Sequence, residues 1–84
     1  MIHRASAKFW RCYGQLPAEI QRLADKNFAL LKRDPSHRSL HFKKAGRFWS
    51  ARVGLHYRVV AVQEGEEIVW FWVGTHEEYN RLRF

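Results

Sequence analysis

Apolar residues in the first third of the chain recur every three or four positions, which is the spacing of helices. Ser6 can cap a short helix that extends to Tyr13. Pro17 suits the first turn of a second helix, which is expected to end near Arg33 because the residue before Pro35 disfavours helical backbone. The second helix has a mainly apolar face made of Ile20, Leu23, Ala24, Asn27 and Leu31.

After Ser36 the pattern changes to alternation and short apolar runs, which is typical of strands. Ala45-Gly46 predicts a turn and Glu64-Gly65-Glu66 a hairpin loop. The last apolar run has no polar face and therefore predicts a central strand. Short connections favour an antiparallel meander, with strands expected at 40–43, 47–53, 57–63 and 68–73.

The last segment begins with a capping box, because Thr75 can cap a helix and Glu78 can reach back to it. A short helix is therefore expected over 75–82. The order of elements predicts an α+β fold, with residues 1–84 forming a single domain. Two N-terminal helices would pack on a three- or four-stranded antiparallel sheet, followed by the short C-terminal helix.

Composition narrows the class of protein. The 84 residues are 46% hydrophobic and 15% aromatic, enough for a folded core without metal or disulfide staples. Cys12 is the single cysteine, so no internal disulfide can form. No apolar run approaches the ~20 residues that cross a bilayer, and residues 1–6 lack the apolar stretch of a signal peptide. We expect a cytoplasmic protein without a cofactor or a membrane partner.

Positive charge is concentrated in one block of the sequence. The formal net charge is +7, and Pro35 to Gln63 contains no acidic residue. Such a block predicts one continuous positive surface that favours an anionic partner. Nucleic acid and an acidic protein both fit this description, and a basic protein without such a partner is the alternative.

Short motifs follow one another in a recognisable order from about Phe9 to Leu82. They are Leu16-Pro17, the long amphipathic helix, Asp34-Pro35, Leu40 with Lys43-Lys44, Arg52-Val53-Gly54, Tyr57-Arg58-Val59, and Val73-Gly74 with His76 and Tyr79. This ordered set resembles the toxins of the RelE/ParE superfamily. The resemblance implies an antiparallel sheet cradled by the N-terminal helices. It also implies a type II toxin–antitoxin system with a cognate antitoxin, which we expect to be acidic.

The superfamily is divided in function. The RelE-like branch resembles a ribosome-dependent endoribonuclease that cuts mRNA, whereas the ParE-like branch poisons DNA gyrase without nuclease activity. The fold does not choose between them. The expectation here is a metal-independent endoribonuclease that inhibits translation. A gyrase inhibitor and an inactive relative that only binds nucleic acid are the alternatives.

Three residues are the candidates for catalysis. Arg58 lies within an apolar strand, so its charge must face a wet groove or a partner. By resemblance it matches the active-site arginine of the nucleases, and His76 matches an active-site basic residue or histidine. Tyr79, three residues further on, could stack on a base or touch phosphate. The alternatives are a structural salt bridge for Arg58, a surface histidine in a capping turn for His76, and core packing for Tyr79.

Four cations are the candidates for RNA binding, with solvated surface cations as the alternative: Lys43, Lys44, Arg47 and Arg52. The best-known nucleases carry lysines where this chain has Phe48 and Ser50, which favours the gyrase alternative.

Histidines also invite a metal interpretation. His37, His41 and His56 fit no common zinc spacing and lack thiol or acid partners, so no metal site is expected.

Overall fold

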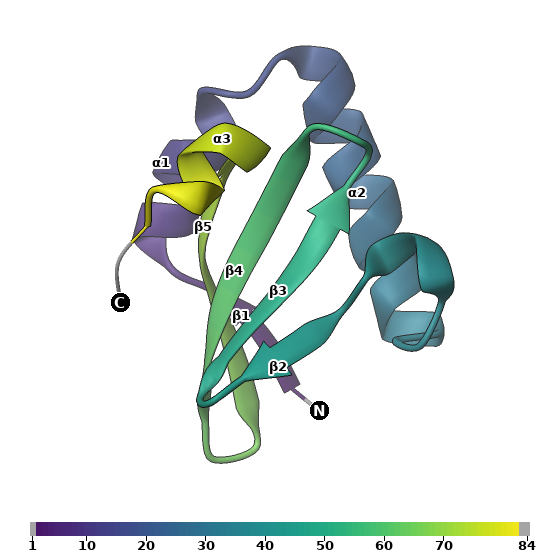
Figure 1. The fold of residues 1–84 in the computed structure, drawn as a ribbon, viewed down its shortest axis with the longest axis vertical. Coiled ribbons are helices and arrows are strands. Elements are labelled where there is room, and N and C mark those ends of the chain that lie inside the picture. The colour runs from purple at the N-terminus through teal and green to yellow at the C-terminus, as the bar shows by residue number, and fades with distance from the viewer. Residues whose placement is uncertain (1, 83–84) are drawn as a thin grey trace.

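The computed structural model describes residues 2–82 as a five-stranded sheet with three α-helices (Figure 1). The strands lie in the order β1-β5-β4-β3-β2; β2 to β5 form an antiparallel meander, and β1 runs parallel to β5. In chain order the elements are β1 (Ile2–Ala5), α1 (Ala7–Gly14), α2 (Ala18–Arg33), the 3₁₀ helix η1 (Arg38–Leu40), β2 (Lys43–Ala45), β3 (Phe48–Val53), β4 (Tyr57–Glu64), β5 (Glu67–Thr75) and α3 (His76–Asn80).

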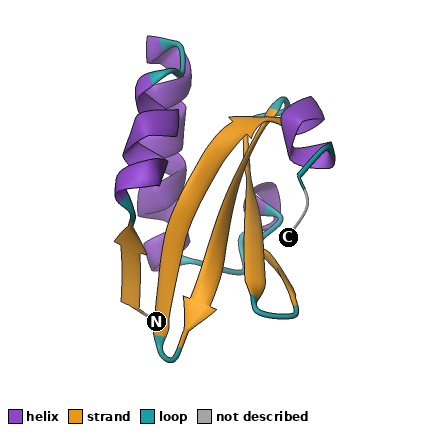
Figure 2. Cartoon of the chain, turned by 90° about the vertical axis from the view of Figure 1, so that its left-hand side faces the viewer, coloured by secondary structure: helices purple, strands orange, loops and turns teal. Residues whose placement is uncertain are grey.

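The predicted helices are confirmed. The Ser6 side chain caps α1 by accepting a hydrogen bond from the Phe9 amide at 3.2 Å, and α2 ends at Arg33. Thr75 and Glu78 form the capping box of α3. Figure 2 shows α1 and α2 on one face of the sheet and α3 on the other. The sheet therefore has one face covered by α1 and α2. The other face, called the open face here, is covered by α3 only at its upper end.

The sheet differs from the predicted one in two places. It has five strands and is mixed, because Ile2 to Ala5 pair in parallel with residues 67–70 of β5. The strand expected at 40–43 is wrong. Residues 38–40 form η1 instead, and His41 adopts left-handed backbone with φ 46°. This turn directs both Leu40 (1% exposed) and Phe42, which stacks on Trp49, toward the core.

An irregularity in β5 changes which side chains share a face. The pairing with β4 shifts between Val60, which lies opposite Trp72, and Ala61, which lies opposite Trp70. The extra residue reverses the alternation of β5. Trp70 therefore packs on the helix-covered face, where its Nε1 donates to His3 Nδ1 at 3.0 Å. Trp72 lies on the open face and contacts Tyr79 of α3.

The core lies between the sheet and α1 and α2. Its buried residues come from α2, η1 and the three inner strands: Leu31, Leu40, Ala51, Ala61, Ile68 and Trp70. Nothing in residues 2–82 is a helix of the length and hydrophobicity that crossing a membrane would require.

Candidate active site

Two arginines meet on the open face of the sheet, one residue pair from the turn between β3 and β4. Arg52 of β3 lies directly opposite Arg58 of β4 in the sheet. Side chains opposite one another in an antiparallel pair are neighbours, and like charges in such positions repel. Within residues 2–82, neither guanidinium has a carboxylate at ion-pair distance, since the ion pairs found there join Arg4 to Glu64 and Glu67. Among the residues that the structure describes, the pair is therefore a positive centre without a counter-ion.

The last helix places two candidate side chains on Arg58. Arg58 Nε donates a hydrogen bond to His76 Nδ1 at 3.3 Å, and the Arg58 guanidinium lies 5.3 Å from the centroid of the Tyr79 ring. The His76 and Tyr79 rings stack at 6.1 Å, as expected for residues three apart on a helix. The structure thus brings the three predicted catalytic residues together.

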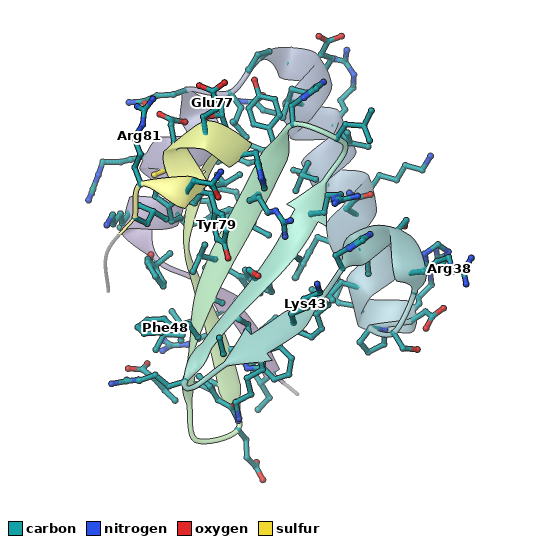
Figure 3. All side chains as sticks on the ribbon, in the orientation of Figure 1. Arg38, Lys43, Phe48, Glu77, Tyr79 and Arg81 are labelled. Carbon is teal, nitrogen blue, oxygen red and sulfur yellow. The ribbon has the colours of Figure 1, made fainter. Side chains whose placement is uncertain are left out.

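The start of α3 is held by its own cap. The Glu78 carboxylate accepts from the Thr75 amide and hydroxyl, at 2.9 and 3.1 Å. These hydrogen bonds lower the pKa of Glu78 below its ordinary value. Figure 3 shows Glu77 on the outer side of α3 while Tyr79 lies over the sheet. Neither Glu77 nor Glu78 forms an ion pair with Arg58 within residues 2–82.

Gly74 of β5 packs closely beneath α3, against the side chains of Trp72 and Glu78. Gly74 lies opposite Arg58, and a Cβ on Gly74 would come within 2.6 Å of the Trp72 ring and 2.8 Å of the Glu78 carboxylate. Only glycine lets the indole lie across this strand while the cap of α3 remains formed. Trp72 in turn contacts the Tyr79 ring at 6.5 Å.

On the other side of the arginine pair lie Lys43 and His41. Lys43 pairs with Ser50 on the face that also carries Arg52. The positive charge of Arg52 lowers the pKa of His41, with smaller contributions from burial and from Lys43 and Arg58. His41 lies two residues before Lys43, on the β2 side of the arginine pair, and we include it in the same cluster. We call Lys43, Arg52, Arg58, His41, His76 and Tyr79 the cationic cluster.

Two of the predicted RNA-binding cations lie apart from this cluster. Lys44 pairs with Trp49, and its Nζ lies 5.7 Å from the centroid of that ring, on the opposite face of the sheet. Arg47 is exposed at the turn between β2 and β3, where its carbonyl accepts from the Gln63 amide at 2.7 Å. Their role in RNA binding stays a prediction.

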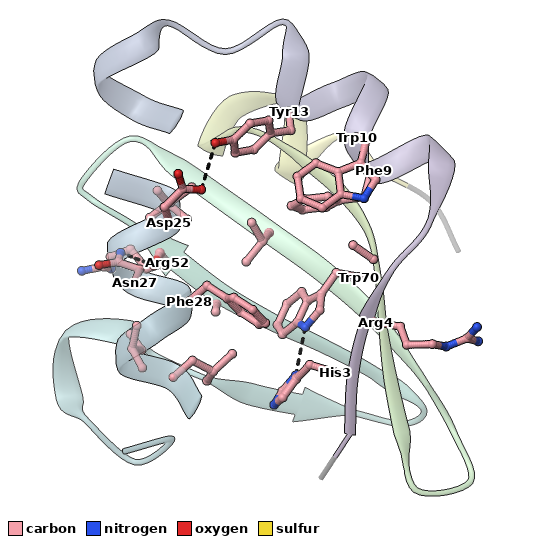
Figure 4. A pocket seen from close by; sticks show the side chains of 17 residues that line it. His3, Arg4, Phe9, Trp10, Tyr13, Asp25, Asn27, Phe28, Arg52 and Trp70 are labelled. Carbon is pink, nitrogen blue, oxygen red and sulfur yellow. Dashed lines mark hydrogen bonds between the residues drawn. The ribbon is translucent and has the colours of Figure 1, made fainter. Parts of the chain in front are cut away.

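The helix-covered face contains an apolar pocket of about 290 Å³ between α1, α2 and the sheet (Figure 4). Phe9, Trp10 and Phe28 form much of its wall. Tyr13 Oη donates to Asp25 Oδ1 at 2.9 Å at one end, which raises the pKa of Tyr13. With this aromatic lining, the pocket suits apolar groups and differs in chemistry from the cationic cluster.

Comparison with known proteins identifies the class. Residues 18–81 match the family model described as ParE-like toxin domain. The chain belongs to this toxin family. It is thus a toxin of the RelE/ParE type, as its motifs predicted. No curated protein matches it.

Solved structures agree with the family on the fold. The RelB–RelE complex from Methanococcus jannaschii contains a chain with 18% identity and a TM-score of 0.72, over 95% of this chain and 99% of that one. The YoeB/ParE toxin from Agrobacterium tumefaciens has 16% identity and a TM-score of 0.65, over 90% of this chain and 99% of the toxin. A chain of the RelBE2 toxin–antitoxin complex from Mycobacterium tuberculosis has 26% identity and a TM-score of 0.62, over 89% of this chain and 96% of that one.

Proposed function

We propose that this toxin is a metal-independent endoribonuclease that cuts mRNA on the ribosome. The observation that carries the proposal is the Arg52–Arg58 pair, unneutralised within residues 2–82 and bordered by His76 and Tyr79. A bridging phosphate would supply the negative charge that this arrangement needs. Guanidinium groups suit a phosphate because they stay charged and present parallel donors.

The geometry also suits the charge that develops during cleavage. When a 2′-hydroxyl attacks the adjacent phosphorus, negative charge builds on the phosphoryl oxygens, and Arg52 and Arg58 would stabilise it. Because His76 Nδ1 accepts from Arg58, Nε2 carries the ring proton and is available as a donor. To act as the acid, His76 must first take up a second proton at Nδ1, which breaks its hydrogen bond with Arg58. The imidazolium would then deliver the Nε2 proton to the departing 5′-oxygen. Tyr79 would hold a neighbouring base or the phosphate.

The gyrase alternative rests on two observations. The matching family model is described as ParE-like, and Phe48 and Ser50 replace the lysines of the best-known nucleases. A supercoiling assay with purified gyrase separates the functions. Inhibition of supercoiling by this protein, with mRNA on programmed ribosomes left intact, would replace our proposal with the alternative.

We propose an acidic antitoxin as the partner that neutralises the cationic cluster. The archaeal and mycobacterial structures cited above are complexes of a toxin with its antitoxin. A net charge of +7 favours a negatively charged partner and fast association with it. Co-expression with the adjacent gene should yield a complex whose association slows as salt rises. Purification from the native operon without such a protein would argue against this partner.

The nuclease proposal is tested with mRNA on programmed ribosomes. Arg58→Gln should lower the cleavage rate about 10²–10³-fold, which corresponds to a rise of about 2.7–4 kcal/mol in the activation free energy. This is the usual effect of losing one donor that stabilises charge in the transition state. Arg38→Gln is the matched control, because it removes the same charge from η1, away from α3 (Figure 3). Equal rates for the two variants, both folded, would contradict a catalytic role for Arg58.

A further inference from the structure

His41 occupies an unusual backbone conformation next to the cationic cluster. It is the sole non-glycine residue with positive φ among residues 2–82. Leu40 before it and Phe42 after it are both anchored in the core, which fixes the backbone between them. Non-glycine residues in left-handed backbone recur at functional sites, where the surrounding structure holds them in place.

The His41 ring has no structural task that explains its position. Within residues 2–82 it makes no hydrogen bond, whereas the nearby His37 accepts from the Ser39 amide to cap η1. Asparagine tolerates left-handed backbone as histidine does, so the backbone conformation by itself does not require an imidazole. A histidine here therefore leaves an imidazole that is free to act on a bound molecule.

The sheet topology places His41 and His76 on opposite sides of the arginine pair. Across the sheet, the order is β5, β4, β3, β2. His76 follows β5 and contacts Arg58 of β4, whereas His41 precedes β2, the strand beside Arg52 of β3. A phosphate bound by both arginines would thus have one histidine on each flank. In-line displacement at phosphorus needs this placement, because the attacking and leaving oxygens lie on opposite sides.

The charges around His41 favour its neutral form. Arg52 of β3, Lys43 of β2 and Arg58 of β4 are all cations, and together with burial they lower the pKa of His41. At neutral pH the ring therefore keeps a free lone pair, as a general base requires. A bound phosphate would offset these positive charges and let His41 accept a proton during the reaction.

We propose that His41 is the general base that accepts the 2′-hydroxyl proton, an inference that rests on the proposed nuclease function. The bond between O2′ and phosphorus forms as a ring nitrogen of His41 takes this proton. The bond between phosphorus and O5′ breaks as His76 protonates O5′. The products are a 2′,3′-cyclic phosphate and a 5′-hydroxyl, and both histidines then exchange protons with solvent. No metal or other co-reactant is consumed.

The test compares His41→Asn with His76→Asn on mRNA that carries one defined cleavage site on a programmed ribosome. Asparagine tolerates left-handed backbone, so the first variant should keep its fold, which circular dichroism checks. The site carries either a normal linkage or a 5′-sulfur in place of O5′, since a thiolate leaves without being protonated. His56→Asn is the control, because His56 is exposed and its ring makes no hydrogen bond within residues 2–82.

His41→Asn should lower the cleavage rate about 10²–10⁴-fold on both linkages and remove the acidic limb of the pH–rate profile. His76→Asn should cleave the normal linkage more slowly than the wild-type protein and recover its rate on the 5′-thio linkage.

Near-wild-type cleavage by His41→Asn, while Arg58→Gln is impaired, would overturn this inference alone. Rescue of His41→Asn by the 5′-thio linkage would also overturn it, because it would make His41 the acid. Absence of cleavage by the wild-type protein would reject the nuclease function itself.

Discussion

Removal of one charge from the arginine pair should make the protein more stable and less active. Arg52 and Arg58 face each other across β3 and β4 without a carboxylate partner in residues 2–82. Like charges in such positions cost about 0.2–1 kcal/mol. With an unfolding entropy of about 2.1 cal/mol/K per residue, a chain of this length changes its Tm by roughly 5–6 °C per kcal/mol. Arg52→Gln should therefore raise the Tm by about 1–6 °C at low salt.

Arg52 is the better position for this test because its own structural contact is retained. Its backbone carbonyl accepts from Asn27 Nδ2 at 3.3 Å, and a side-chain substitution leaves this bond intact. Arg58→Gln would also remove the hydrogen bond to His76. The double variant Arg52→Gln/Arg58→Gln should have a Tm little higher than that of Arg52→Gln alone, because the repulsion between the two arginines can be removed only once.

Thermal denaturation at low and high salt measures the effect. Salt screens the repulsion, so the wild-type protein should gain more stability from added salt than Arg52→Gln does. Arg38→Gln removes an equal charge outside the pair and should leave the Tm nearly unchanged. A fall of several degrees for Arg52→Gln, independent of salt, would refute the reasoning and show that its guanidinium has a stabilising structural partner.

Three further outcomes follow from particular contacts. Gly74→Ala should destabilise the fold by about 1–3 kcal/mol by forcing the Trp72 ring aside, measured by urea denaturation, and should lower activity by displacing α3. Leu40→Ala, at a side chain that is 1% exposed, should cost about 2–5 kcal/mol in the same assay. Burial lowers the pKa of His3 most, followed by repulsion from the N-terminus and Lys32. The unfolded chain therefore binds this proton at higher pH than the folded one, so stability falls as pH drops below about 6.5. His3→Gln should flatten that pH dependence, and an unchanged slope would contradict it.

The elements that the sequence predicted correctly are those with local signals. The helix over 18–33 has a long apolar face and ends just before Asp34-Pro35, and the capping box of α3 is visible in four residues. β1 carries no such signal, because Ile2 to Ala5 is short and its pairing depends on β5 at the far end of the chain. Leu40 and Phe42 alternate like strand residues, but left-handed backbone at His41 directs both to the core.

The candidate site was predictable where family motifs mark it and hidden where backbone geometry creates it. Arg58, His76 and Tyr79 came from the motifs, and the structure gathers them. The direct opposition of Arg52 and Arg58 depends on strand register, which the length of the turn between β3 and β4 sets. His41 joins them through tertiary folding alone, and periodicity carries no information about it.

The parallel pairing of β1 with β5 has a consequence for how quickly the toxin can form. Ile2 pairs with Glu67, so closing the sheet requires contact between residues 65 positions apart in the chain. Contacts at such separation carry a large loop-closure entropy before they contribute stability, and they slow folding. His76 and Tyr79 are also added late in synthesis, which proceeds from the N-terminus. A nascent chain therefore lacks both the pairing of β1 and the helix that contacts Arg58 until β5 and α3 have been synthesised, so the cationic cluster is assembled only after those elements.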